Sequence, residues 1–387
     1  MRKAAGNAAE NVKAAGNTAR MSSNERLPSR VPRHDPPMIA ATPIDAHAPD
    51  WRREWREAVT DPHELLRLLG LDALADRISL PPRDGFTLRV PHSFVARMRR
   101  GDAADPLLRQ VLPLIEEELP VAGYDLDAVG DLDSRAQAGV LHKYEGRALL
   151  ITTGSCAVHC RYCFRRHFPY ADETAARDRW KTAIAHLRSD TSISEVLLSG
   201  GDPLSLATHR LKELTDALAL IPHVRRLRLH TRLPIVLPAR VDVELCDWIS
   251  ALPWPVAIVV HANHANEIDG SVRTALRQLR DTGATLLNQS VLLRHVNDSV
   301  EALAELSETL FESAVLPYYL HLLDRVQGTA HFDVPEETAV AIERSLRMRL
   351  PGYLMPRWVR EIAGEPFKTP MAELSRQPPA PRSAGAP

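Results

Sequence analysis

The sequence has few cysteines, no long apolar run and almost no net charge, and each shortage excludes a class of protein. Its 387 residues include 4 cysteines, too few for a disulfide scaffold of this size. No apolar stretch approaches the roughly 18 to 20 residues that cross a bilayer, and the N-terminus lacks a secretory apolar core. The 48 basic and 49 acidic residues leave a net charge of -1, so no overall field attracts nucleic acid or an anionic membrane. We expect a cytoplasmic globular protein without nucleic-acid or membrane partners.

The two ends of the chain have compositions that do not form a core. Residues 1–49 contain KAAGN twice and are then rich in proline, and residues 376–387 are rich in proline, alanine and serine. Such segments bury too little apolar surface to offset their ordering entropy, so we predict a disordered N-terminal extension and a disordered tail. The repeat suggests an upstream extension before a start at Met21, which the intact mass of natively expressed protein would test.

Between these ends a helical pattern gives way to alternating strands and helices. Thr60-Asp61-Pro62 followed by HELLRLLG predicts a helix that ends at Gly70, within a helical N-terminal domain over residues 50–141. Apolar runs rich in β-branched residues then begin at 147, 195, 226, 256, 285 and 315, with helical patterns such as 211–220 and 272–281 between them. Six such units are fewer than the eight of a closed barrel, so we predict an α/β fold with a partial (βα)6 barrel over residues 142–350.

Polar residues collect where the predicted strands end. In a parallel α/β barrel the reactive groups gather at the carboxyl ends of the strands, so an active site is expected at this rim. The strand ends carry Cys156, the run Ser199-Gly200-Gly201-Asp202, Thr231 with Arg232, His261 with Asn263, Asn288 with Gln289, and His321 with Asp324.

Three of the four cysteines, Cys156, Cys160 and Cys163, lie within eight positions directly after the first predicted strand. A structural zinc site needs four ligands, and the fourth here would be His159 or His167. A [4Fe-4S] cluster held by only three thiolates instead leaves one iron open to a small molecule. The remaining cysteine is isolated in VELCDWIS and is expected to be a small core residue.

The spacing CxxxCxxC after one strand, followed by SGGD at the end of the next, resembles the radical S-adenosylmethionine superfamily. There the open iron chelates the methionine part of S-adenosylmethionine, and the glycine-rich backbone meets its amino group. The stretches LHKYEGRALL, CRYCFRRHFPY, HANHANEI, LLNQSVLLRHVND and GEPFKTP narrow the resemblance to the lysine 2,3-aminomutase family, over about residues 50–375. The sequence CRYCFRRHFPYA and the 19 residues beyond Lys368 most resemble the branch that makes (R)-β-lysine for elongation factor P.

The resemblance implies an isomerase that converts (S)-α-lysine to (R)-β-lysine with a [4Fe-4S] cluster, S-adenosylmethionine and pyridoxal 5′-phosphate. Lys368, in a C-terminal segment over residues 351–375, would hold pyridoxal phosphate as a Schiff base. For the substrate, Arg165 would grip the α-carboxylate, and Asp324 with Glu361 would receive the ε-ammonium. The cluster ligands would be Cys156, Cys160 and Cys163, and the further cofactor contacts Lys143, Tyr144, Arg147, Ser199, Gly200, Gly201, Asp202, His261 and Gln289.

Two positions depart from the family pattern, and simpler interpretations remain open. Glu361 stands where the family has aspartate, and Tyr162 where a histidine is common. A radical enzyme without pyridoxal phosphate would have no use for Lys368, which could be a surface charge, and an iron–sulfur electron carrier would not need the three substrate residues. A catabolic lysine 2,3-aminomutase is the other alternative. The expected partners are lysine, a reductant such as flavodoxin or ferredoxin, and, functionally, elongation factor P and its lysine ligase.

Overall fold

The computed structural model describes residues 50–374 apart from 80–85 and 179. The N-terminal extension and the C-terminal tail predicted from composition therefore lie outside the described residues. Within the described part, no helix is both long enough and apolar enough to span a bilayer.

One mixed sheet runs through the described residues, and its ten strands are neighbours in chain order from β1 to β10. The strands from β3 to β9 are parallel, whereas β1, β2 and β10 run antiparallel to their neighbours. The two edge strands of the described sheet do not pair with each other, so the sheet is open. The strands are β1 (Arg135–Gln137), β2 (Val140–Tyr144), β3 (Arg147–Thr153), β4 (Glu195–Gly200), β5 (Arg226–Thr231), β6 (Val256–Val260), β7 (Thr285–Val291), β8 (Leu316–His321), β9 (Arg357–Arg360) and β10 (Thr369–Pro370).

The six strands predicted from the apolar runs are β3 to β8, and the predicted α/β class is confirmed. Their order follows the chain, as strand–helix repeats require, because each crossover returns to the next position in the sheet. The strands that the apolar runs did not predict, β1, β2, β9 and β10, are short or carry charged residues, as in RWVR of β9.

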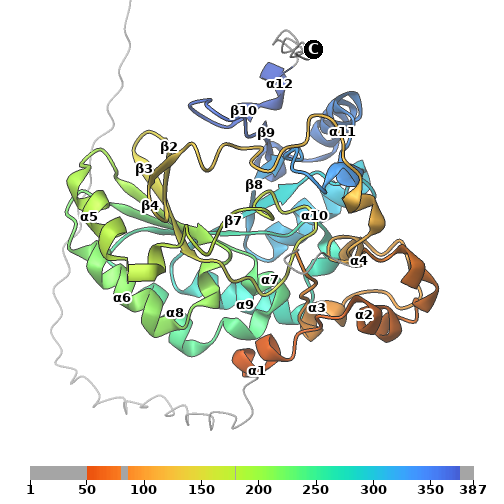
Figure 1. The fold of residues 1–387 in the computed structure, drawn as a ribbon, viewed down its shortest axis with the longest axis horizontal. Helices are drawn as coiled ribbons and strands as arrows, with labels where there is room; N and C mark the ends of the chain where they lie inside the picture. Colours follow the sequence, from red (N-terminus) through yellow and green to blue (C-terminus); the bar gives the residue numbers. More distant parts are fainter. Residues whose placement is uncertain (1–49, 80–85, 179, 375–387) are drawn as a thin grey trace, which may run out of the picture. The chain divides into compact units, whose positions relative to one another are not determined.

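Helices connect the parallel strands and bury one face each. They are α5 (Lys181–Ser189), α6 (Thr208–Ala219), α7 (Leu233–Val236), α8 (Val243–Ser250), α9 (Gly270–Asp281), α10 (Val300–Glu312) and α11 (Glu336–Arg349). Figure 1 shows α5, α6, α8 and α9 along one outer side of the sheet. In α9 the buried side chains Val272, Ala275, Leu276 and Leu279 recur at helical spacing, so this face packs inward. Cys246 of α8, expected to be a core residue, is only partly buried and packs against this core.

Short helices precede the sheet: α1 (Trp51–Arg56), α2 (Pro62–Leu69), α3 (His92–Val95) and α4 (Pro106–Arg109). The predicted signals of α2 hold, because the Asp61 side chain accepts from the backbone N–H of His63 and Gly70 ends the helix with φ 68°. Phe94 and Leu107 are fully buried in the same apolar cluster as the strands β3 to β7. The helical segment therefore packs directly on the strand–helix units.

The C-terminal hairpin of β9 and β10 brings two predicted site residues opposite each other. Thr369 pairs with Arg360 in this hairpin, so Glu361 and Lys368 follow as the next facing positions. A second apolar cluster, which includes Trp358 and Met371, anchors the two strands and α12 (Met371–Leu374). The register of the hairpin therefore brings Glu361 and Lys368 together, although seven positions separate them in the chain.

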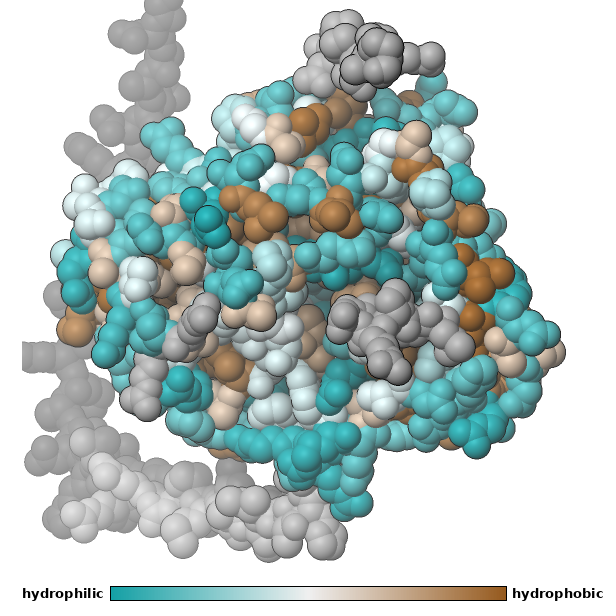
Figure 2. All heavy atoms as spheres, in the orientation of Figure 1, coloured by the Kyte–Doolittle hydropathy of each residue, from teal (hydrophilic) through white to brown (hydrophobic). Residues whose placement is uncertain are grey.

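On the face shown in Figure 2, hydrophilic residues predominate and the apolar ones form small separate patches. This distribution is the ordinary one for a protein surface in water.

Candidate active site

A cavity of about 520 Å³ opens inside the curved sheet, with walls drawn from Phe86 to Lys368. The residues predicted to bind the cluster, the cofactors or the substrate all line this cavity, although their positions in the chain lie far apart, whereas Asn288 of β7 does not line it. The predicted residues that line it are Lys143, Tyr144, Arg147, Cys156, Cys160, Cys163, Arg165, Ser199, Gly200, Gly201, Asp202, His261, Gln289, Asp324, Glu361 and Lys368. The structure therefore brings the sulfur-rich loop and the C-terminal lysine to one space.

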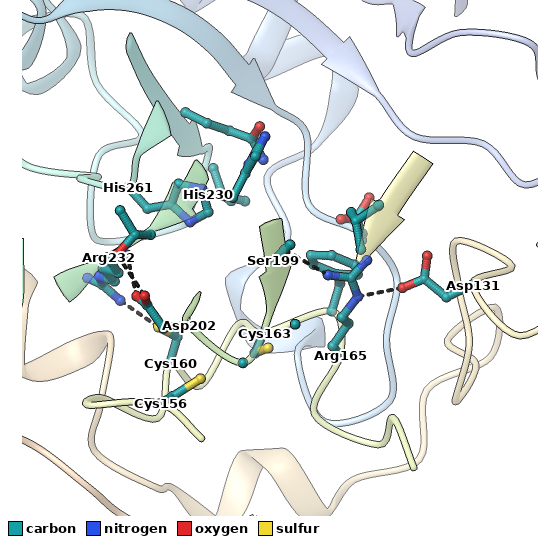
Figure 3. A pocket seen from close by; sticks show the side chains of 18 of the residues that line it. Asp131, Cys156, Cys160, Cys163, Arg165, Ser199, Asp202, His230, Arg232 and His261 are labelled. Atoms are coloured by element: carbon teal, nitrogen blue, oxygen red, sulfur yellow. Dashed lines mark hydrogen bonds and ion pairs between the residues drawn. The ribbon is translucent and has the colours of Figure 1, made fainter. Parts of the chain in front are cut away.

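The three loop cysteines are free thiols at one side of the cavity (Figure 3). Burial, followed by the nearby Asp202 carboxylate, raises the pKa of Cys156 well above its usual range. Burial and the neighbouring Cys160 raise the pKa of Cys163 to about 11. The thiols of Cys156 and Cys163 are therefore protonated near neutral pH without a metal group, so a group that binds them must displace protons.

The spacing of the sulfurs favours a cluster over a single zinc ion. In a tetrahedral zinc site the ligand sulfurs lie roughly 3.8 Å apart. Among the described residues, the three cysteines do not form a group whose ligand atoms all lie within 4.8 Å of one another. Three separated thiols fit a [4Fe-4S] cluster with one open iron.

The glycine-rich end of β4 packs against the cysteine loop. The N–H of Gly201 donates to the Thr153 carbonyl at 2.7 Å, and the N–H of Asp202 donates to the Ser155 carbonyl at 2.8 Å. A Cβ on Gly201 would lie 2.4 Å from the Ser155 oxygen, closer than real contacts allow. Glycine is needed here because two backbones approach closely.

Asp202 and Arg232 tie the ends of β4 and β5 to that loop. The carboxylate of Asp202 accepts from the Thr231 hydroxyl at 2.7 Å and from the Arg232 N–H at 2.6 Å, so both of its oxygens have protein partners. The guanidinium of Arg232 donates to Cys160 Sγ at 2.7 Å and to Glu267 at 2.9 Å. Arg232 therefore places a buried positive charge directly on a predicted cluster ligand.

Alternating charges form a chain between Lys368 and Arg165. The Lys368 ammonium pairs with Glu361, and Lys143 Nζ lies 2.9 Å from the other oxygen of that carboxylate. Lys143 Nζ also lies 2.7 Å from Asp131, whose second oxygen accepts from Arg165 Nε at 2.6 Å (Figure 3). Sequence reasoning missed Asp131, which lies in DLDSRAQ without any local motif. Its partner Arg165 is thereby held in one orientation at the cavity wall.

The pKa values follow from this chain of charges. Burial alone would raise the pKa of Glu361, but the ammonium groups of Lys368 and Lys143 outweigh it and hold that pKa well below its usual range. Asp324 has no such direct partner in the described part of the chain, and burial, reinforced by the Glu361 charge, raises its pKa to about 7. One carboxylate is thus committed to protein cations, while the other is poised to meet a cation from outside.

Several buried polar atoms of the cavity wall have no partner among the described residues. They are Nε2 of His230, Nε2 of His261, Nε2 of His321 and Oδ1 of Asp324. Burial, followed by repulsion from Arg232, lowers the pKa of His261 to about 4, so this ring is neutral. An unsatisfied buried polar atom costs roughly 1 to 3 kcal/mol, and a polar ligand in the cavity would remove that cost.

The start of β3 and the end of β2 also contribute residues to the cavity, at the end of β3 opposite to the cysteine loop. They are Lys143, Tyr144 and Arg147. Tyr144 pairs with Arg147 at the turn between β2 and β3, where β3 begins. The Arg147 guanidinium lies 4.7 Å from the centre of the Tyr144 ring and forms no ion pair with a described carboxylate. Arg228, at the start of β5, lines the same region but pairs with Glu195. An unpaired arginine here and an amine at Lys368 fit the phosphate and the aldehyde of pyridoxal phosphate.

The parallel sheet, the free thiols and the charged cavity together define an α/β iron–sulfur enzyme. Residues 145–231 match the family described as "4Fe-4S single cluster domain". The chain is 48% identical to L-lysine 2,3-aminomutase of Escherichia coli (strain K12), over 85% of this chain and 96% of that protein. It is 33% identical to L-lysine 2,3-aminomutase of Clostridium subterminale, over 84% of this chain and 79% of that protein. The chain belongs to the lysine 2,3-aminomutase family of radical S-adenosylmethionine enzymes.

Among solved structures, the chain aligns with the crystal structure of Streptococcus suis SuiB bound to S-adenosylmethionine. That alignment has a TM-score of 0.41 and 12% sequence identity, and it covers 57% of this chain and 51% of SuiB.

Proposed function

We propose that this protein is a lysine 2,3-aminomutase that converts (S)-α-lysine to (R)-β-lysine with a [4Fe-4S] cluster, S-adenosylmethionine and pyridoxal phosphate. The observation that carries the proposal is that Lys368 and the three loop cysteines line one cavity. The identity of 48% to the E. coli L-lysine 2,3-aminomutase supports the same reaction. When bound, the cluster and S-adenosylmethionine supply one-electron chemistry that moves a hydrogen atom, and pyridoxal phosphate supplies the aldehyde that carries the migrating amine.

The residues of this chain would bind, orient and enclose those groups. Cys156, Cys160 and Cys163, which line the cavity, would hold the cluster through their three thiolates. Arg147 and Tyr144 would fix the phosphate at the start of β3, and Lys368 would provide the amine that holds the aldehyde.

The substrate would lie between the two charged ends of the cavity. Arg165 is held by Asp131 through Nε, so its terminal nitrogens can be presented to an α-carboxylate. The ε-ammonium would pair with Asp324, whose Oδ1 is buried without a partner. Glu361 is engaged with both Lys143 and Lys368, so it would act on the substrate only after Lys368 has lost its charge by binding the cofactor.

The use of the product for elongation factor P belongs to the same proposal. Alignments of similar length span 96% of the E. coli relative but 79% of the Clostridium relative, so the E. coli protein is the shorter of the two. The identity to the E. coli protein is also higher, so this chain is more similar to the shorter relative. We place the reaction in the cytoplasm, with a flavodoxin- or ferredoxin-like reductant. Mass spectrometry of elongation factor P from a strain lacking this gene should show loss of β-lysine, restored by the intact gene. Unchanged modification with impaired growth on lysine would instead indicate the catabolic role.

One anaerobic assay tests the reaction. Reconstituted protein with S-adenosylmethionine, pyridoxal phosphate, dithionite and labelled (S)-α-lysine should yield (R)-β-lysine, resolved from the substrate by chromatography. Lys368→Ala should abolish product, because it removes the amine that would hold the aldehyde of the cofactor, while the iron content and the cluster absorbance stay unchanged.

The matched control is Lys212→Ala, an exposed lysine of α6 that pairs with Asp216 and should leave turnover intact. Normal turnover in Lys368→Ala would overturn the assignment of the cofactor lysine.

A further inference from the structure

Two histidines and an aspartate converge outside the cavity, between β2 and the end of α5. They are His142 of β2, His186 in the last turn of α5 and Asp190, the residue that caps this helix. One ligand atom from each of the three lies within 4.8 Å of the others. No part of the proposed reaction uses this cluster, so the inference does not rest on the proposed function.

The local geometry presents the three side chains to one point. His186 and Asp190 are four residues apart at a helix end, so they share one face. Leu141 and Lys143 line the cavity, but His142 between them does not, and neither do His186 and Asp190. The cluster therefore lies outside the cavity.

The polar atoms of the cluster are poorly satisfied by the protein alone. His186 Nε2 is buried and has no partner among the described residues. His142 Nδ1 lies 3.6 Å from Asp190 Oδ2, which is too long for a hydrogen bond. It is close to the roughly 3.3 Å that separates two ligands of one tetrahedral zinc ion.

The second oxygen of the aspartate is already held in place. Asp190 Oδ1 accepts from the N–H of Ser192 at 3.0 Å and from its hydroxyl at 2.6 Å. Such contacts orient a carboxylate for coordination through its other oxygen. The side chains of His142 and Asp190 are 22% and 30% exposed, so an ion can enter and keep a water ligand.

We propose that His142, His186 and Asp190 bind a divalent transition-metal ion of the zinc class, with water completing the coordination. Neutral imidazoles and a carboxylate are ligands that this class of ion prefers. The bound ion joins β2 to α5, and because Lys143 follows His142 directly, it also fixes the strand that carries one link of the charge chain in the cavity.

The test measures zinc binding to the full, untagged chain after cluster reconstitution, so that the cysteines are occupied and no purification tag contributes ligands. Equilibrium dialysis with Zn²⁺ followed by elemental analysis should give one tightly bound equivalent per chain. His186→Ala and Asp190→Asn should each weaken binding at least about tenfold. Asparagine can still accept from Ser192, so the second variant preserves the turn. Zinc should also raise the Tm of the parent protein but not of the variants.

The control is His209→Ala, which removes an exposed histidine of α6 and should bind zinc as the parent does. The proposal is overturned if the reconstituted parent binds no zinc. It is equally overturned if either ligand variant retains the parent's affinity, or if the control loses as much affinity as they do.

Discussion

At the scale of single residues, the cavity holds charges whose pKa values depend on what occupies it. Asp324 is the clearest case, because its Oδ1 is buried without a described partner and its pKa is raised to about 7. Glu361, the residue directly after β9, has its pKa lowered by Lys368 and Lys143 despite its burial. Two carboxylates close together therefore differ in protonation near neutral pH.

Replacing Asp324 by asparagine should change how stability depends on pH. The pKa of Asp324 is about 7 in the folded protein and about 3.9 in the unfolded chain. Between these two values the folded state keeps the proton that the unfolded state has lost. The stability from this group is therefore lost as the pH rises to the folded pKa of about 7. As the pH rises from 5 to 8, the free energy of unfolding of the ligand-free variant should therefore increase by roughly 2 to 3 kcal/mol relative to that of the parent. Urea unfolding across that range measures the gain. Asp216→Asn, at an exposed ion pair, should show no such trend, and a flat difference for Asp324→Asn would contradict the raised pKa.

Arg232 should tune the cluster through its contact with Cys160. A hydrogen bond from a cation to a ligand sulfur stabilises the extra electron of the reduced cluster. Arg232→Gln should therefore make the reduction potential more negative, by up to about 65 to 130 mV for a one-electron couple, since a charge-assisted hydrogen bond contributes about 1.5 to 3 kcal/mol. Redox titration followed by electron paramagnetic resonance measures the shift. Arg232→Lys keeps the charge and should shift less, whereas equal potentials in all three proteins would show that the contact does not reach the cluster.

At the scale of elements, the turn after β4 and the cysteine loop form one unit. Gly201→Ala places a Cβ 2.4 Å from the Ser155 oxygen, and because the obstacle is backbone, the loop must move. We expect a loss of about 1 to 3 kcal/mol in stability and reduced iron content after reconstitution. Gly270→Ala is the matched control, since nothing lies within 4 Å of its Cβ. Unfolding curves and iron assays of the two variants measure these losses. Full cluster loading of Gly201→Ala would contradict the view that the turn after β4 and the cysteine loop form one rigid unit.

The elements that the sequence predicts are those with a strong local pattern. β3 to β8 are apolar runs, and α2 carries both of its end signals, Asp61 and Gly70. β9 and β10 lack such a pattern. They are held instead by the apolar cluster around Trp358 and by pairing with residues distant in the chain, which a local pattern does not reveal. Asp131 escaped notice for the same reason, since its importance comes only from the two cations that meet it.

The rule that places active residues at the carboxyl ends of strands explains only part of the cavity. It accounts for the cysteine loop and for His261, but Tyr144 and Arg147 lie where β3 begins. Their relation to the site came from the family resemblance rather than from periodicity. The open sheet lets the cavity run along the strands, so both ends of β3 contribute to its wall.

At the scale of the whole molecule, the fold rests on apolar packing, so it should survive loss of the cluster. The largest apolar cluster joins the N-terminal helices to the strands β3 to β7, and only Cys160 of the three cluster cysteines packs against it. A variant with Cys156, Cys160 and Cys163 all changed to alanine should keep the far-ultraviolet circular dichroism of the parent. Its Tm should fall by only a few degrees, because a domain of this size loses about 2 to 4 °C per kcal/mol.

The same variant separates the two ends of the cavity. Lys368 is held by Glu361 in the β9–β10 hairpin, and this hairpin is anchored by the other apolar cluster, around Trp358 and Met371. The variant should therefore still bind pyridoxal phosphate, with the absorbance of the bound cofactor lost only when Lys368→Ala is added. Binding of the cofactor that disappears with the cysteines alone would mean that the hairpin depends on the cluster for its shape. Retained binding would show that the hairpin with Lys368 keeps its shape independently of the cluster at the cysteine end of the cavity.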